Sequence, residues 1–301
     1  RFASFTLLAK GDYPAEMDIT LPFSLVSNNV SADRLEVMPA YWWLYNMYAL
    51  ARNTWKYRAR DKRITKVQNI EFDTFAPDTM QEVIRARQLL ELWVGKAYIN
   101  DNALSKENLP EDNSQFSTFN FQFEGRRLLL GDRKVVDALT ILGEGMENSR
   151  REVYILKAYD AYHAYGDMLI HYAVSNILNR EEDFAAIAIE KADIRNSAQE
   201  QEWINLGGQL VTEKEVTALR RDICNGTLSS WEAIHNRYNE LWKRYPSEKL
   251  QHALHALGTV LETGCMTGEL WRETLSHAER IQHYICEQVY LSRKKDHDNP
   301  F

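Results

Sequence analysis

The chain has 301 residues, 45% of them hydrophobic and 26% charged, which is the composition of a globular protein and not of a disordered one. Its formal net charge of -7 argues against a general nucleic-acid-binding protein, because such domains are usually basic as a whole. No apolar run approaches the roughly 18 residues that a bilayer span requires, so we expect a cytoplasmic protein with neither a membrane nor a nucleic-acid partner.

Residues 1–38 have the character of β-structure. Phe5–Ala9 and Ile19–Val26 are short and β-prone, and the turn-rich segment Gly11–Pro14 separates them. The chain starts at Arg1, directly in a strand-like segment. We therefore expect a fragment of a longer polypeptide, in which residues 1–38 form a β-type N-terminal stub at the exit of a preceding domain.

Helical patterns dominate after Pro39. Residues 41–60 contain neither Gly nor Pro, and a capping box of Thr79 and Glu82 predicts the start of a helix that runs to about Tyr98. FNFQF at 119–123 alternates with period two and predicts a strand, which we take as part of one small hairpin. A short helix is expected over 133–142, before the Gly-Glu-Gly break at 143–145.

Three further capping boxes predict helix starts in the second half of the chain: Ser149 with Glu152, Thr212 with Glu215, and Ser229 with Glu232. The first box opens the longest predicted helix, which runs to about Leu178. The helix that starts after Ser229 should stop before Pro246, because proline removes a helical hydrogen bond. Helices over 247–263 and 267–295 complete the chain.

Gly207-Gly208 is the best internal boundary in the sequence. It separates a main helical domain at 39–206 from a C-terminal helical subdomain at 209–301. The predicted fold is therefore mainly α, a multi-helix, bundle-like body with a short β-type N-terminal stub and one small hairpin.

An aromatic block runs into a basic one in YWWLYNMYALARNTWKYRARDKR at 41–63. At 100° per residue, four cations lie along one stripe of the predicted helix and are the candidate anion-binding residues: Arg52, Lys56, Arg60 and Arg63. Four aromatic side chains are candidates for stacking on the ring of a ligand: Trp42, Trp43, Trp55 and Tyr57. The same pattern also fits a packed helix with a solvated or ion-paired basic face, or a protein-docking surface.

A second polar stripe lies on the predicted helix over 149–178. Four side chains there fall within an arc of about 80° and are the candidate catalytic group: Asp160, His163, Asp167 and His171. Histidine and carboxylate at i, i+4 spacing can bind a metal or form a base with its orienting acid. Because this helix is apolar almost all round, it should be central, and a hydrogen-bonded buried seam or the wall of a cleft is the alternative.

No metal site and no cofactor are predicted. The cysteines Cys224, Cys265 and Cys286 lack metal or disulfide spacing, and we expect them to be buried small apolar groups in a reducing compartment. The motifs GxxxxGK[ST], GxGxxG, GxSxG and HExxH are absent from the sequence, which argues against common nucleotide-hydrolysing and serine-hydrolase enzymes. The residues alone identify no reaction.

Four strings carry a family resemblance: LPFSLVSN at 21–28, MPAYWWLYNMYALARNTWKYRARDKR at 38–63, FAPDT at 75–79 and GMENSRREVYILKAYDAYHAYGDMLI at 145–170. They resemble the C-terminal half of an uncharacterised bacterial family of left-handed β-helix proteins that are considerably longer than this chain. Those proteins are often labelled N-acetylglucosamine-1-phosphate uridyltransferase-like or hexapeptide-repeat acyltransferase-like.

The resemblance implies that residues 5–26 are the last coil of a β-helix and that a β-helix domain of the same polypeptide is a partner. It also implies a homotrimer, since β-helix transferases commonly trimerise. This chain departs from the family label in having no run of hexapeptide repeats and no Gly-rich nucleotidyltransferase loop. No catalytic residue is therefore carried over to a numbered position.

The leading hypothesis is a helical accessory domain of a sugar-nucleotide or acyl transferase-like β-helix protein. It would bind a phosphorylated sugar or nucleotide through the basic stripe and would not be catalytic by itself. Two alternatives stay open: a stand-alone enzyme that uses the His/Asp group, and a purely structural or oligomerisation domain without a ligand.

Overall fold

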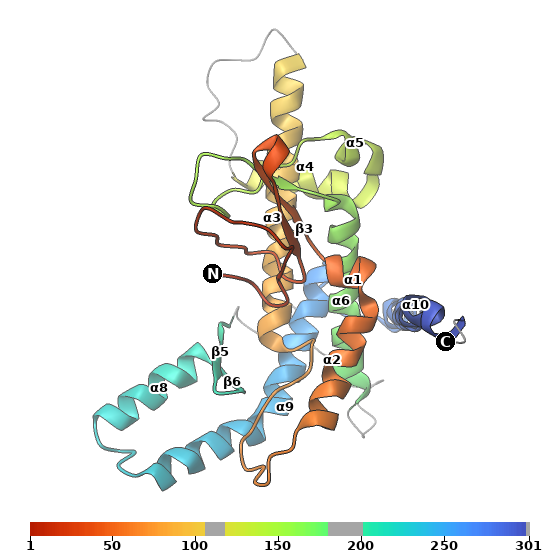
Figure 1. Cartoon of the computed structure of the whole chain (residues 1–301). Helices are drawn as coiled ribbons and strands as arrows, with labels where there is room; N and C mark the ends of the chain where they lie inside the picture. Colours follow the sequence, from red (N-terminus) through yellow and green to blue (C-terminus); the bar gives the residue numbers. More distant parts are fainter. Residues whose placement is uncertain (106–117, 180–200, 299–301) are drawn as a thin grey trace. The chain divides into compact units, whose positions relative to one another are not determined.

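The computed structural model describes residues 1–105, 118–179 and 201–298, and these residues are mainly helical, which confirms the predicted fold class (Figure 1). The chain divides into two compact units. The first combines residues 1–47 with 82–166, and the second combines residues 48–81 with 167–301. This division differs from the predicted domains at 39–206 and 209–301, because two long helices belong in part to each unit: α3 (Pro77–Ser105) and α6 (Ala158–Leu178).

A four-stranded sheet organises the first unit, in the order β1 (Leu7–Leu8), β2 (Leu25–Asn29), β3 (Arg34–Met38) and β4 (Val153–Ile155). The β2–β3 pair is antiparallel, whereas β1 pairs with β2 and β4 with β3 in parallel. The turn between β2 and β3 is a short 3-10 helix, after which Asp33 adopts a left-handed conformation with φ 47°. Residues 1–38 are therefore built into a sheet with a strand from far along the chain and do not form a separate stub.

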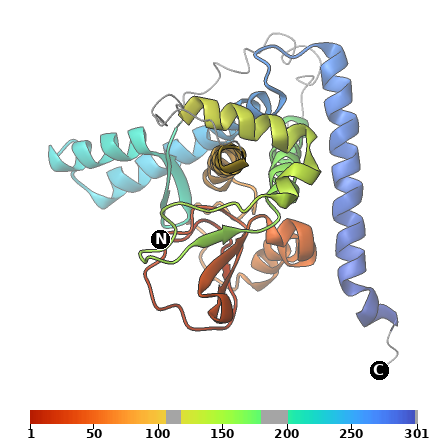
Figure 2. The same cartoon turned by 90° about the horizontal axis from the view of Figure 1, so that it is seen from above.

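The short helix α1 (Tyr41–Tyr45) follows the sheet strands in this unit, and α3 and α4 (Thr118–Gly131) pack against each other at very close range. Figure 2 looks along α3, with α4 running across it and the sheet on its other side. A side chain at Gly95 of α3 would collide with the Phe121 carbonyl of α4, and one at Gly125 of α4 would collide with the Glu91 carbonyl of α3. Glycine therefore sets the distance between the two helices.

The predicted strand over 119–123 is wrong, because these residues are part of α4. Period-two alternation would place Phe119, Phe121 and Phe123 on one face, yet Phe123 is 61% exposed. The residues that pack inward follow helical spacing instead, with Gly125 against α3 and Leu128 and Leu129 fully buried. The small hairpin of the structure is elsewhere, at β5 (Trp203–Leu206) and β6 (Gln209–Thr212).

The predicted helix over 149–178 begins nine residues later than expected, at Ala158. Val153–Ile155 is the edge strand β4, and Lys157 has a positive φ of 55°, which separates the strand from α6. Ser149 is no helix cap, since its hydroxyl donates to Glu147 at 2.6 Å. The capping box of Ser149 and Glu152 is thus a wrong prediction, produced by a sequence match in a β-connection.

The remaining predicted helix starts agree with the structure to different degrees. Thr212 caps α8 (Glu213–Cys224) as predicted, whereas the cap of α9 (Trp231–Leu261) is Ser230 and not Ser229. Helix α3 starts with Pro77 at its first position, so Thr79 lies inside the first turn and is not the predicted cap, and Glu82 accepts the backbone N–H of Ser4 at 2.7 Å. The short helix expected over 133–142 is α5 (Arg133–Ala138).

The second unit contains α2 (Met47–Arg60) and α10 (Gly268–Asp298), and its β5–β6 hairpin, α8 and α9 contribute to two small apolar clusters. Pro246 lies inside α9 and does not end it, so the predicted stop is wrong. Gly207 and Gly208 form the hairpin turn with φ of 68° and 109°, as a tight turn with two left-handed positions requires. The predicted domain boundary is therefore the tip of a hairpin that packs within this unit.

Helices α8 and α9 run side by side in opposite directions beyond that hairpin (Figure 1). Glu215 of α8 accepts from Arg237 at 3.4 Å and from Arg244 at 2.9 Å, which lie about two turns apart on one face of α9. Val216 of α8 and Leu241 of α9 close an apolar cluster with β6. The second unit thus has its own core, which supports the loop described next.

Candidate anion-binding site

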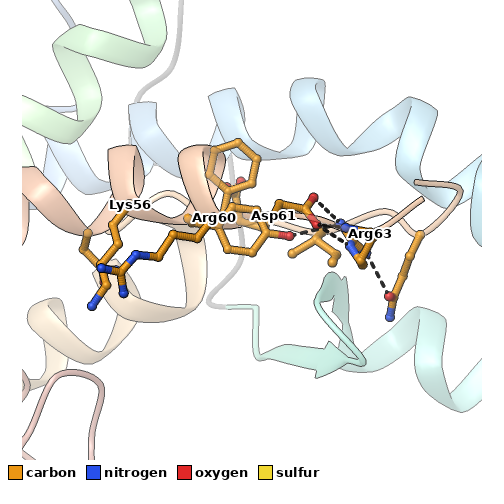
Figure 3. Close-up of a pocket in the computed structure, with 10 residues that line it drawn as sticks. Lys56, Arg60, Asp61 and Arg63 are labelled. Atoms are coloured by element: carbon orange, nitrogen blue, oxygen red, sulfur yellow. Dashed lines mark hydrogen bonds and ion pairs between the residues drawn. The ribbon is translucent and has the colours of Figure 1, made fainter. Parts of the chain in front are cut away.

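The candidate site lies at the C-terminal end of α2 and in the loop over residues 61–76 that follows it. A concave surface lies there, and the volume of its hollow is about 720 Å³. Its lining includes three cations and two aromatic rings: Lys56, Arg60, Arg63, Tyr57 and Phe72 (Figure 3). All of these residues belong to the second unit. Three of the four candidate anion-binding residues therefore line one surface.

The fourth predicted cation, Arg52, does not line this surface. It is exposed one helical turn earlier on α2, with its guanidinium carbon 5.6 Å from the centroid of the Tyr48 ring. Another cation covers the same ring, because Arg293 of α10 lies 3.9 Å from that centroid. Arg52 thus takes part in a cation–π arrangement that packs α10 beside α2, and it is not part of the candidate site.

Arg63 is held by an acid within the loop and is not a free cation. Its Nε and Nη2 donate to the two oxygens of Asp61, both at 2.9 Å, in a bidentate pair. Arg63 also donates to Tyr57 Oη at 3.2 Å and to Gln68 Oε1 at 3.2 Å. Hydrogen bonds from Arg63 hold the pKa of Asp61 well below its usual range, so this carboxylate stays ionised. Arg63 therefore shapes the loop, and its charge is neutralised.

Glu71, the other acid of the site, is also engaged. Its Oε2 accepts from Lys249 Nζ at 2.9 Å and from Tyr245 Oη at 2.5 Å, and Lys249 reaches Asp73 Oδ2 at 2.9 Å as well. Burial opposes the charge on Lys249, yet its two carboxylate partners outweigh burial and raise its pKa. These contacts fix the far end of the loop on α9.

A buried chain of polar groups continues from that anchor. Tyr172 Oη lies 3.1 Å from His252 Nδ1, and His252 Nε2 lies 3.2 Å from Gln81 Oε1. Burial lowers the pKa of His252 to about 3, so the ring is neutral. The neutral tautomer that fits both neighbours has Nε2 donating to Gln81 and Nδ1 accepting from Tyr172. Every member of this chain is satisfied, which is the arrangement of a structural network.

Lys56 and Arg60 remain as the unneutralised cations of the site. They stand at i, i+4 on α2, and Figure 3 shows their side chains extended side by side, away from the Asp61–Arg63 pair. Across the described ranges, neither side chain has a hydrogen-bond or ion-pair partner. Two like charges at this spacing destabilise a helix by about 0.2–0.5 kcal/mol. An anion placed between them would remove that repulsion.

Position on the helix explains part of this charge. Arg58 and Arg60 are the basic residues of the last turn of α2, where the helix dipole favours cations by about 0.3–1 kcal/mol each. The dipole accounts for the sign of the charge but not for the lack of an acidic neighbour beside both Lys56 and Arg60. Because both also line one concave surface, they are the candidates for holding an anion.

An aromatic pair forms the apolar part of the site. The Tyr57 and Phe72 rings are stacked at 4.9 Å between centroids and 18° between planes, and the Arg58 guanidinium carbon lies 4.9 Å from the Phe72 centroid. Phe72 was missed by the sequence analysis. It lies outside any periodic pattern, and only folding of the 61–76 loop back onto α2 places it beside Tyr57.

The other predicted stacking residues do not contribute to the site. Trp43 is 1% exposed in the core of the first unit, and the indole Nε1 of Trp42 is also buried there. Trp55 is 67% exposed on α2 but does not line the concave surface. Of the four aromatic candidates, only Tyr57 is therefore a site residue. Trp42 and Trp43 serve packing in the first unit.

The predicted His/Asp group does not form one site. Asp160 pairs with Arg133 at 2.9 Å, and His163 Nε2 lies 2.9 Å from the Leu129 carbonyl oxygen. Further along α6, Asp167 lies 3.0 Å from His277 Nε2.

His171, the last member, is half-buried with its ring edge-to-face against Phe75 at 5.6 Å, and partial burial lowers its pKa. In the described part of the chain, no three His, Cys, Asp or Glu side chains are placed to hold a metal ion. The four residues are engaged separately along the helix; His163 is exposed and the other three are partly buried.

The prediction of buried cysteines is wrong, since Cys224, Cys265 and Cys286 are all exposed free thiols. Cys224 is the last residue of α8, Cys265 lies in the connection between α9 and α10, and Cys286 lies on the exposed side of α10. Among the described residues, no helix combines the length and the apolar character that crossing a bilayer requires.

Comparison with known proteins gives one relative to report. The chain is 37% identical, over 303 aligned positions that include its whole length, to an uncharacterised protein of Treponema pallidum (strain Nichols). It spans 39% of the length of that relative. No protein-family model and no solved structure matches the chain.

Proposed function

We propose that this chain is a helical accessory domain that binds an anionic, ring-bearing ligand, a phosphorylated sugar or a nucleotide, at the end of α2. The observation that carries the proposal is the pair of unneutralised cations, Lys56 and Arg60, side by side on one concave surface. Arginine grips phosphate oxygens with paired donors and lysine acts as a mobile point charge, so the two complement each other on a phosphate.

The size and the lining of the site support a small molecule. A volume of about 720 Å³ is within the roughly 300–1,000 Å³ of small-ligand sites. The Tyr57–Phe72 pair places apolar surface beside the cations, where the ring of a nucleotide or sugar would lie. The engagement of Asp61 and Glu71 by other residues favours an anion, because it leaves no free carboxylate to repel it.

The larger protein that the domain would serve is a sugar-nucleotide or acyl transferase-like β-helix protein. This part of the proposal rests on the sequence resemblance, as do the adjoining β-helix domain and the homotrimer. Within the proposal, the domain is a ligand-holding element and the chemistry takes place on groups outside it. The chain spans 39% of the length of its relative, which fits the proposal that it is one domain of a larger protein.

Isothermal titration tests the site. We expect UDP-N-acetylglucosamine or N-acetylglucosamine 1-phosphate to bind, while N-acetylglucosamine without phosphate does not. Acetyl-coenzyme A, titrated in parallel, distinguishes the acyl-transferase alternative. The double variant Lys56→Gln/Arg60→Gln should weaken binding at least about tenfold, since hydrogen bonds to charged groups each contribute about 1.5–3 kcal/mol.

The matched control is Lys214→Gln/Arg220→Gln, which removes the same two charges from the exposed face of α8. This variant should bind like the wild type. If both double variants lose affinity equally, the effect is one of net charge and the proposed site is wrong. If none of the phosphorylated ligands binds the wild type, the proposal itself fails.

A further inference from the structure

The loop over residues 62–67, which follows α2, exposes two aliphatic side chains between cations. Ile64 is 103% exposed and Val67 is 81% exposed, so both present their whole side chains to solvent. Lys62 precedes Ile64, Lys66 lies between Ile64 and Val67, and both lysines are exposed as well. Large aliphatic residues are usually buried, and such a combination on one short loop needs a physical explanation.

Contacts at both ends of the loop fix it in this form. Arg63 is clamped to Asp61 and Gln68, as described above. Gln68 Nε2 in turn donates to the Gly207 carbonyl at the β5–β6 turn, at 2.7 Å. Asn69 Nδ2 reaches Asn239 of α9 at 3.1 Å. The loop is tied down on either side of its apolar residues, so the exposure of Ile64 and Val67 is a built feature of the second unit.

Charge indicates what would cover this loop. The segment Lys62–Val67 contains no acid, and it carries two cations, Lys62 and Lys66, besides Arg63, whose charge Asp61 neutralises, whereas the chain as a whole carries a net charge of -7. The acid nearest to it, Asp61, is already held by Arg63, and its contact with Lys66 is long at 3.8 Å. An anionic partner is therefore attracted to this loop and repelled by most of the remaining surface.

We propose that the 62–67 loop binds the surface of an anionic lipid bilayer, with Ile64 and Val67 inserted at the level of the acyl-chain boundary and Lys62 and Lys66 among the headgroups. Aliphatic side chains gain free energy when they leave water for hydrocarbon, and lysines near an anionic leaflet are attracted to it. Nucleic acid would use aromatic or planar side chains to stack on bases, and Ile64 and Val67 provide neither.

This inference is independent of the small-ligand site, because it uses four side chains that do not line the concave surface. The expectation of no membrane partner was based on the lack of a membrane-spanning segment in the sequence. Binding to a membrane surface does not need such a segment. Exposed apolar residues together with basic ones are sufficient for reversible attachment to a membrane surface.

Vesicle cosedimentation of the full chain tests the proposal, with vesicles of phosphatidylcholine alone and of phosphatidylcholine with phosphatidylserine in a two-to-one mixture. The wild type should bind the mixed vesicles and bind pure phosphatidylcholine at least about tenfold more weakly. Lys62→Gln/Lys66→Gln should reduce binding to the mixed vesicles by about 30-fold, and Ile64→Ser/Val67→Ser by at least about tenfold.

Two controls define the specificity. Val30→Ser removes an aliphatic side chain that is 78% exposed in the first unit, and Lys214→Gln/Arg220→Gln removes two charges from α8. Both should bind vesicles like the wild type. Since all the substituted side chains are exposed, circular dichroism and the melting temperature should be unchanged in every variant.

Three results would overturn the proposal: no binding of the wild type to the mixed vesicles, wild-type binding by Ile64→Ser/Val67→Ser, or an equal loss in the α8 control. A single-stranded RNA arm identifies the rival partner. RNA binding that depends on Lys62 and Lys66 but not on Ile64 and Val67, without vesicle binding, would assign the loop to nucleic acid.

Discussion

The close crossing of α3 and α4 makes a sharp prediction for Gly125. A Cβ atom at this position would lie 1.8 Å from the Glu91 carbonyl oxygen, whereas real Cβ atoms essentially never approach closer than 3.0 Å. The two helices must therefore separate by about 1.2 Å to accept alanine. The obstacle is backbone on a neighbouring helix, so no side-chain rotation can relieve it.

The cost follows from that separation. Moving the helices apart loosens the contacts of residues that are fully buried at the interface, such as Leu90, Leu128 and Leu129. Overpacking of a core costs about 1–3 kcal/mol, and a backbone obstacle places Gly125→Ala at the upper end. Alanine regains about 0.5–1 kcal/mol through its helix propensity. The net expectation is a loss of about 2 kcal/mol in the free energy of unfolding.

Thermal unfolding followed by circular dichroism measures this loss. Gly125→Ala should lower the melting temperature by about 4–8 °C, from the usual 2–4 °C per kcal/mol in a domain of this size. Gly166→Ala is the control, because Gly166 lies within α6 and a Cβ there meets no atom within 4 Å. The control should be as stable as the wild type or slightly more so. If Gly125→Ala and Gly166→Ala have the same melting temperature, glycine does not set the spacing of α3 and α4.

Three further outcomes are expected. Burial lowers the pKa of His252 to about 3 in the folded chain, so below the ordinary value of 6.5 only the unfolded chain takes up the proton. The stability that this residue contributes is complete above pH 6.5, and the free energy of unfolding should fall by about 2 kcal/mol by pH 5. Urea unfolding across this pH range measures the fall, and His252→Gln should show a flatter pH profile. Lys249→Met leaves Glu71 buried without its cation and should lower the free energy of unfolding by about 3 kcal/mol in the same assay. Adding Glu71→Gln should restore part of this loss. If Lys249→Met alone is as stable as the wild type, the anchoring role is wrong. Tyr57→Leu should weaken a ring-bearing phosphorylated ligand but leave the affinity for pyrophosphate unchanged, and equal weakening of both would argue against ring contact.

The fold class and the basic stripe could be predicted from the sequence because both depend on local signals. Helical periodicity and a basic run on α2 are visible without tertiary contacts, and Thr212 was a true cap for the same reason. The predictions that failed depend on distant partners. Val153–Ile155 is a strand because β3 pairs with it, and 119–123 is helical because Gly125 packs on α3.

The site was predictable only in its charge. Spacing on one helix identified Lys56 and Arg60, but it could not show that Arg63 turns back to Asp61 or that Arg52 lies beside Tyr48. The aromatic residues show the same limit. Trp43 and Tyr57 look alike as members of one run, and only the packing of each unit separates a buried ring from a site-lining one.

The central claim is that Lys56 and Arg60 together hold an anion. The change in melting temperature caused by Lys56→Gln, measured without and with ligand, tests this claim most directly. Without a ligand, Lys56→Gln removes a like-charge neighbour and should raise the melting temperature slightly, by relief of about 0.2–0.5 kcal/mol. Ligand at a hundred times its dissociation constant stabilises the wild type by about 2.7 kcal/mol. With saturating UDP-N-acetylglucosamine, Lys56→Gln should therefore melt below the wild type. An equal ligand-induced increase in melting temperature for both proteins would contradict the account.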